Sequence, residues 1–141
     1  MSETVGAVLL VEDSEDDVFA FRRAYKKANL DLPLQIVTDG QQAVDYLAGD
    51  GEFAARDRYP LPRLMFLDLK LPYLDGFEVF SWMRDRKDLS SVSVVVLTGS
   101  DEQRDRQQAT ELGARGYIVK PAEPNELVDV FENLGLLPEA S

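Results

Sequence analysis

Five short apolar runs alternate with segments of helical pattern along the 141 residues, and this alternation restricts the fold more than any other feature. Short, continuous apolar runs are typical of strands buried on both faces, as in a parallel sheet. The runs occupy residues 7–11, 64–67, 92–97 and 117–119, and a shorter run at 34–37 alternates more, as an edge strand would. Buried strands that alternate with helices predict an α/β fold, (βα)5, in which a doubly wound parallel sheet carries helices on both faces. Right-handed crossovers limit the strand order, and the common five-stranded order is 2-1-3-4-5.

The segments between these runs carry signals for helices and loops. Ser14 with Asp17, and Asp75 with Glu78, each have the spacing of a capping box at the start of a helix. Residues 52–63 are polar and contain two prolines. We therefore expect this stretch to form a surface loop, long for a connection of this kind.

Composition excludes several classes of function. The net charge of −11 and the pI of about 4.4 argue against direct binding of nucleic acid or an anionic membrane, because both partners require a basic face. The chain has no cysteine and no histidine, which excludes disulfides, thiolate sites, histidine triads and histidine-ligated metals. Any metal must be held by oxygen atoms, which favours a hard cation such as Mg²⁺.

The length of the chain suits one domain, 1–141, with its core at about 7–134 and short tails at both ends. No apolar run is long enough to cross a bilayer, and residues 1–3 do not resemble a signal peptide. We therefore expect a cytoplasmic protein.

Candidate site residues follow four of the five apolar runs. They are Glu12 and Asp13 after the first run, Asp68 after the third, Thr98 after the fourth and Lys120 after the fifth. The carboxyl ends of parallel strands lie at one edge of a sheet, and ligands bind at that edge in open α/β proteins. We therefore expect these side chains to share one shallow site.

Three neighbouring carboxylates repel one another. At ~4 Å, two like charges cost about 4 kcal/mol at an effective dielectric constant of about 20. Mg²⁺ would relieve this repulsion. We expect Asp13 and Asp68 as direct ligands, Glu12 acting partly through water, and the backbone carbonyl of Lys70 completing the shell.

With Mg²⁺ in place, Asp68 is either a plain ligand or a nucleophile, since aspartyl phosphates are known covalent intermediates. The Lys120 ammonium and the Thr98 hydroxyl would then bind oxygens of a phosphoryl group transferred to Asp68. Each residue alone also has an ordinary structural explanation, such as a turn residue, a solvated helix start, a helix cap or a surface lysine. Their joint position at one sheet edge favours the site.

The joint pattern resembles the receiver domain of two-component response regulators. It comprises Val11-Glu12-Asp13, Leu67-Asp68-Leu69-Lys70-Leu71-Pro72 with Asp75-Gly76, Leu97-Thr98-Gly99 and Val119-Lys120-Pro121, and the resemblance extends over about 7–134. It implies a flavodoxin-like fold and phosphotransfer to Asp68 from the phosphohistidine of a sensor histidine kinase or a phosphotransfer protein. It also implies Mg²⁺ dependence and slow self-catalysed loss of the phosphoryl group. Such a protein catalyses only its own phosphorylation and dephosphorylation.

The same resemblance implies that Thr98 and Tyr117 form a switch, in which Thr98 moves toward the phosphoryl group and Tyr117 turns inward. The surface of the fourth helix, fifth strand and fifth helix then changes, and homodimers form through this face in the family. The chain ends soon after Leu134, so we expect output through contact with a downstream protein or through a phosphorelay. The long 52–63 loop resembles stand-alone regulators that partner phytochrome-type sensor kinases.

Two residues depart from the usual family pattern. Gly99 stands where alanine is common, and Lys70 lies two positions after Asp68, where it is expected to alter the lifetime of the phosphoryl group. Three other functions remain as alternatives: a receiver-like module that is never phosphorylated, a Mg²⁺-dependent phosphohydrolase of the haloacid-dehalogenase type, and a flavin or nucleotide binder. Lys70 stands where the phosphohydrolase needs a second aspartate. No glycine-rich phosphate loop follows the first apolar run, which disfavours the nucleotide binder.

Overall fold

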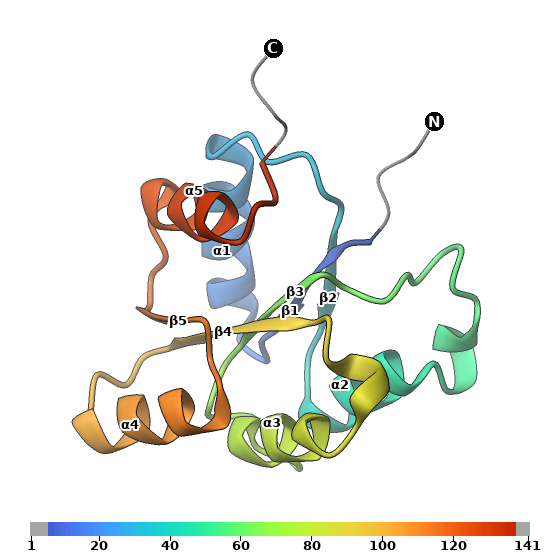
Figure 1. Cartoon of the computed structure of the whole chain (residues 1–141). Coiled ribbons are helices and arrows are strands. Elements are labelled where there is room, and N and C mark those ends of the chain that lie inside the picture. The colour runs from blue at the N-terminus through green and yellow to red at the C-terminus, as the bar shows by residue number, and fades with distance from the viewer. Residues whose placement is uncertain (1–5, 138–141) are drawn as a thin grey trace.

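A five-stranded parallel sheet lies between two layers of helices in the computed structural model, which describes residues 6–137 (Figure 1). In chain order the elements are β1 (Val8–Val11), α1 (Glu15–Lys27), β2 (Leu34–Val37), α2 (Gly40–Ala48), the 3₁₀ turn η1 (Gly51–Ala54), β3 (Leu64–Leu67), α3 (Gly76–Arg84), the 3₁₀ turn η2 (Lys87–Leu89), β4 (Ser93–Thr98), α4 (Gln103–Leu112), β5 (Gly116–Val119) and α5 (Pro124–Asn133). The strand order is β2-β1-β3-β4-β5, which confirms the predicted doubly wound, flavodoxin-like α/β fold.

The central strands end level with one another. Val11 of β1 is paired with Leu67 of β3, and Leu67 is paired with Val96 of β4. All four residues of β1 and of β3 are buried, as their apolar runs predict. The next residues along the chain, Glu12 and Asp68, therefore emerge side by side at the carboxyl edge of the sheet.

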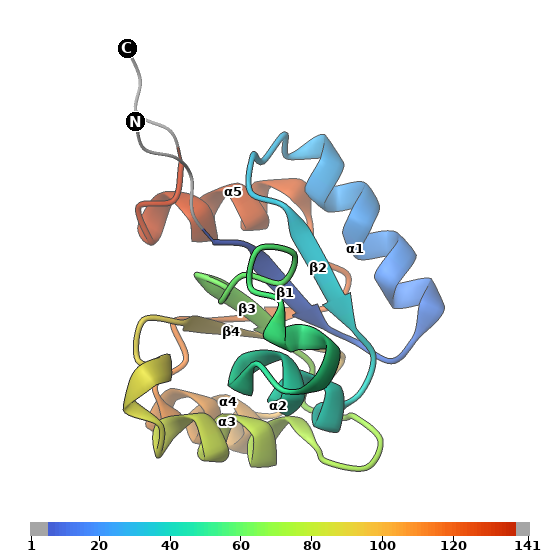
Figure 2. The same ribbon diagram turned by 90° about the vertical axis from the view of Figure 1, so that its right-hand side faces the viewer.

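Helices cover both faces of the sheet. Helices α1 and α5 lie on one face, and α2, α3 and α4 lie on the other (Figures 1 and 2). Phe66 of β3 packs toward α1 and α5, where its ring meets Phe21 edge-on with 5.0 Å between the ring centroids. Its neighbour Met65 packs on the opposite face with Val79 of α3. Alternate residues of one strand thus belong to two separate apolar clusters, which is why the strand needs an unbroken apolar run.

One of the two predicted capping boxes forms and the other does not. At α3, the Asp75 carboxylate accepts the Glu78 backbone N–H while the Glu78 carboxylate accepts the Asp75 backbone N–H. At α1, Ser14 Oγ accepts the backbone N–H of Asp17 at 3.3 Å, but the Asp17 carboxylate does not return to Ser14. The capping-box prediction at Ser14 is therefore wrong in its second half, because that carboxylate has a stronger cationic partner elsewhere.

The 52–63 stretch is mostly a surface loop, as expected, but one of its aromatic side chains packs into the core, which its polar composition does not predict. It begins inside η1, and Phe53 is buried against Tyr46 of α2 and Tyr59, with 5.1 Å between ring centroids in both pairs. The Arg56 guanidinium donates hydrogen bonds to three backbone carbonyls, including those of Tyr46 and Leu47 at the end of α2. Aromatic packing and the hydrogen bonds of Arg56 hold the segment between α2 and β3 against α2.

Most of the predicted tails, residues 1–5 and 138–141, and the prediction of no signal peptide at residues 1–3 lie outside the described residues. Within residues 6–137, no helix has the length and apolar character needed to cross a bilayer.

Candidate functional site

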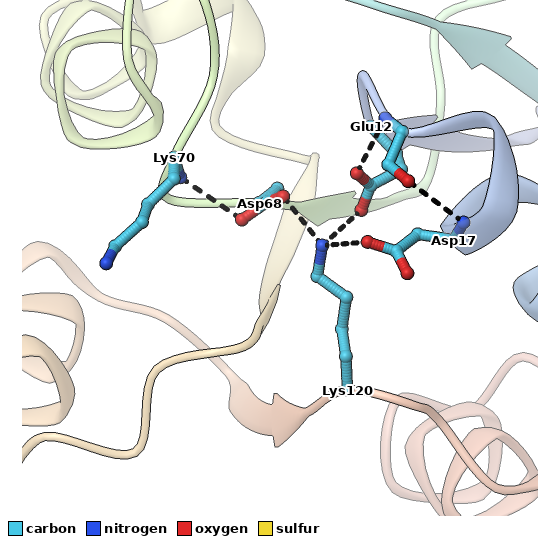
Figure 3. Close-up of polar contacts among 6 residues, drawn as sticks. Glu12, Asp17, Asp68, Lys70 and Lys120 are labelled. Carbon is cyan, nitrogen blue, oxygen red and sulfur yellow. Dashed lines mark hydrogen bonds and ion pairs between the residues drawn. The ribbon is translucent and has the colours of Figure 1, made fainter.

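Lys120 is the centre of a group of ion pairs at the carboxyl edge of the sheet. Its Nζ donates hydrogen bonds to Glu12 Oε1, Asp17 Oδ2 and Asp68 Oδ2, each at 2.8 Å. Figure 3 shows the Lys120 side chain reaching from the end of β5 toward the ends of β1 and β3. Two of the predicted acids, Glu12 and Asp68, therefore meet the predicted lysine in one site.

The ends of the strands fix this arrangement through the backbone. The Asp68 N–H donates to the Val11 carbonyl at 3.3 Å, and the Lys120 N–H donates to the Thr98 carbonyl at 2.8 Å. Each of these side chains therefore starts from a backbone position held by the sheet. Sites on regular elements are held more accurately than sites on free loops.

Glu12, Asp13 and Asp68 each offer a carboxylate oxygen, and these three oxygens lie within 4.8 Å of one another. Glu12 and Asp68 are buried, whereas Asp13 is exposed. Oxygen donors of this kind suit a hard divalent cation. Because every carboxylate oxygen has two lone pairs, the bonds to Lys120 leave acceptor capacity for such an ion.

Burial and charge act against each other in this group. Burial raises the pKa of Glu12 above its ordinary value, and the hydrogen bonds from Lys120 and the Ser14 amide oppose only part of that effect. Burial by itself would lower the pKa of Lys120. The hydrogen bonds to Asp17, Asp68 and Glu12 outweigh that burial and hold the pKa of Lys120 above its ordinary value. Lys120 is therefore a fully protonated cation at neutral pH.

The segment after Asp68 turns tightly around it. The Lys70 backbone N–H donates to Asp68 Oδ1 at 3.1 Å, while the Lys70 side chain points away from Lys120 (Figure 3). The Gly76 N–H donates to the Leu69 carbonyl at 3.1 Å, and a Cβ at Gly76 would overlap the Asp68 carbonyl oxygen. Glycine is required there by this close approach. The predicted role of the Lys70 carbonyl as a metal ligand stays a prediction.

Thr98 and Tyr117, the two predicted switch residues, lie on neighbouring strands. Thr98 is fully buried, and its Oγ is the one buried side-chain polar atom of residues 6–137 that has no hydrogen-bond partner. The Tyr117 hydroxyl donates to the Ser100 carbonyl at 2.8 Å, and the Arg106 guanidinium of α4 lies 4.5 Å from the centre of its ring. Tyr117 thus bridges the loop after β4 and the start of α4.

An open cavity of about 590 Å³ lies over the site. Its lining combines Asp68, Lys70 and Lys120 with the loop after β4, namely Thr98, Gly99, Ser100, Asp101 and Glu102. A phosphoryl-sized group therefore has room beside Asp68, and no bulky apolar side chain lines the space.

Asp17 is a site residue that the sequence patterns do not predict. It lies in the first turn of α1, where its spacing from Ser14 predicts a helix cap, yet its carboxylate binds Lys120. Its position in an acidic run directly after β1 is the signal that pointed toward the site edge.

Comparison with known proteins gives the family context. The family model described as the response regulator receiver domain matches residues 8–132. Response regulator Rcp1 of Synechocystis sp. (strain ATCC 27184 / PCC 6803 / Kazusa) is 34% identical over 127 residues, which cover 90% of this chain and 84% of that protein.

Solved structures agree with the sequence comparison. The bacteriophytochrome response regulator RtBRR superposes with a TM-score of 0.85 at 37% identity, covering 98% of this chain and 82% of that one. The Mn(2+)-bound form of response regulator Rcp1 gives a TM-score of 0.77 at 33% identity, covering 95% and 99%. The phosphorylated cyanobacterial phytochrome response regulator RcpA gives a TM-score of 0.73 at 32% identity, covering 93% and 91%.

Proposed function

Since the chain belongs to the response regulator receiver domain family, we propose that it accepts a phosphoryl group on Asp68 from the phosphohistidine of a partner kinase or phosphotransfer protein. The observation that carries this proposal is the position of Asp68. Its carboxylate is buried at the end of β3, 2.8 Å from the Lys120 ammonium and within the three-carboxylate cluster. A solvated turn aspartate would have none of these partners.

The transfer needs a nucleophile and neutralisation of charge, and no strong base. One Asp68 carboxylate oxygen forms the new O–P bond while the N–P bond of the phosphohistidine breaks. The electron pair of that bond stays on the imidazole nitrogen, which takes a proton from water. The Lys120 N–H that meets Asp68 would bind an oxygen of the transferred group, and the buried Thr98 hydroxyl, which has no other partner, would turn to bind another.

Glu12, Asp13 and Asp68 would hold the divalent cation, which we propose to be Mg²⁺. When bound, such a cation supplies positive charge against the transferring phosphoryl oxygens. The relative Rcp1, solved in a Mn(2+)-bound form, supports a metal of this kind. The chain's own contribution is to keep the three carboxylates converged and to keep Lys120 charged beside them.

The response to phosphorylation is proposed to run through Thr98 and Tyr117. The Thr98 hydroxyl would turn toward the phosphoryl group, and the loop after β4 would follow it. The Tyr117 hydroxyl is bonded to that loop at Ser100, so a shift of the loop would move Tyr117 and the adjoining face of α4, β5 and α5. We propose that this face contacts the downstream protein or a second copy of the chain. The named relatives make a phytochrome-type sensor kinase the proposed phosphodonor.

Incubation with acetyl phosphate and Mg²⁺, followed by intact-mass measurement, tests the proposal. We expect the wild-type protein to gain one phosphoryl group, and we expect no gain in the Asp68→Asn variant or after chelation of Mg²⁺. Asp57→Asn is the matched control, because Asp57 is exposed and outside the cluster. Equal labelling of the Asp68→Asn variant would show that Asp68 is not the acceptor.

A further inference from the structure

All three N–H donors of the Lys120 ammonium are in use. An ammonium group has three donors, and the three acceptors are Glu12 Oε1, Asp17 Oδ2 and Asp68 Oδ2 at 2.8 Å each (Figure 3). Asp68 is the proposed phosphoryl acceptor, so the direction of the third donor matters for the reaction. Glu12 and Asp17 hold the other two donors and together set that direction.

Glu12 and Asp17 differ in which other groups their carboxylates bind. Glu12 and Asp68 both belong to the three-carboxylate cluster, whereas Asp17 does not. A divalent cation in the cluster would therefore share the Glu12 carboxylate with Lys120. Of the carboxylates bound to Lys120 within residues 6–137, only Asp17 lies outside the cluster that would hold a divalent cation.

The start of α1 holds Asp17 in place. Its backbone N–H is bonded to Ser14 Oγ, and the Ser14 N–H is bonded to Glu12 Oε2 at 3.1 Å. Glu12 and Asp17 are therefore linked through hydrogen bonds to Ser14. A carboxylate in the first turn of a helix is also favoured by the positive end of the helix dipole. The Asp17 side chain is 41% exposed, against 1% for Glu12, so it can hold Lys120 without a large desolvation cost.

We propose that Asp17 is a positioning residue, which fixes the Lys120 ammonium so that its third N–H stays directed at Asp68 and at the phosphoryl group that Asp68 receives. This inference rests on the proposed phosphorylation of Asp68. Asp17 itself touches no reacting atom and acts through Lys120.

The test compares the Asp17→Asn and Asp16→Asn variants of the full chain, with acetyl phosphate as the phosphodonor. Both substitutions remove one negative charge from the first turn of α1, and Asp16 is exposed. Removing charge alone should leave the rate unchanged or raise it, because the phosphodonor is an anion. We expect Asp17→Asn to lower the rate by about threefold to tenfold, since a displaced group costs rate when geometry is lost. The Mg²⁺ concentration for half-maximal rate should stay within about twofold, because Asp17 lies outside the cluster.

A double-mutant cycle separates positioning from general damage. In a Lys120→Ala background, Asp17→Asn should produce no further loss, since its effect passes through the ammonium. An equal loss in that background, or equal rates for Asp17→Asn and Asp16→Asn, would overturn the inference. Failure of the wild-type protein to label would instead refute the phosphorylation of Asp68.

Discussion

Asp13→Asn should make the protein more stable when no divalent cation is present. At 4.8 Å, the separation that bounds the three carboxylate oxygens, two like charges repel by about 3.5 kcal/mol at an effective dielectric constant of about 20. Asp13 is exposed, so water screens much of its repulsion, and Lys120 offsets part of the charge of the other two acids. We therefore expect the free energy of unfolding to rise by about 1 kcal/mol.

In the presence of Mg²⁺, the wild-type protein should be more stable than the Asp13→Asn variant. A ligand at ten times its dissociation constant stabilises a folded protein by about 1.4 kcal/mol, so wild-type protein should gain this amount from Mg²⁺. The Asp13→Asn variant lacks one of three carboxylates and should gain little. Urea unfolding with Mg²⁺ or with a chelator measures both effects, with Asp57→Asn as a control that changes neither. A variant that is less stable without Mg²⁺, or that gains as much from Mg²⁺ as wild type, would refute the reasoning.

Two further substitutions test separate parts of the structure. Thr98→Val removes a buried hydroxyl that has no partner, so the free energy of unfolding of the unphosphorylated protein should stay equal or rise by up to about 1 kcal/mol in urea unfolding; a clear loss would mean that the hydroxyl is bonded. Phe53→Ala empties the contact with Tyr46 and Tyr59 and should cost about 3 kcal/mol, while labelling of folded protein stays unchanged. Unchanged stability would show that the Phe53 packing does not stabilise the fold.

The sheet was predictable because burial on both faces demands apolar residues at every position of a central strand. β1 and β3 meet this demand, and the registered strand ends then place Glu12 and Asp68 together. The meeting of these acids with Lys120 follows from strand order alone, so the position of the candidate site could also be predicted.

Other features depend on packing that no local pattern encodes. Whether the Asp17 carboxylate turns back to cap α1 or reaches Lys120 depends on how α1 lies against the end of β5, 103 residues away along the chain. In the 52–63 stretch, Phe53 packs on Tyr46 of α2 and on Tyr59. The polar composition of the segment as a whole gives no sign of this packing. The Thr98 hydroxyl was expected in the site, but its lack of any partner is visible only in the structure.

Locating the phosphoryl group within the chain is the most direct experiment. Protein labelled with acetyl phosphate and Mg²⁺ can be digested at acid pH, and the peptides compared by mass spectrometry. We predict that the added phosphoryl group lies on the peptide that contains Asp68 and on no other. A phosphoryl group found on a different aspartate, or no stable label under conditions that label a known receiver domain, would contradict this account of the site.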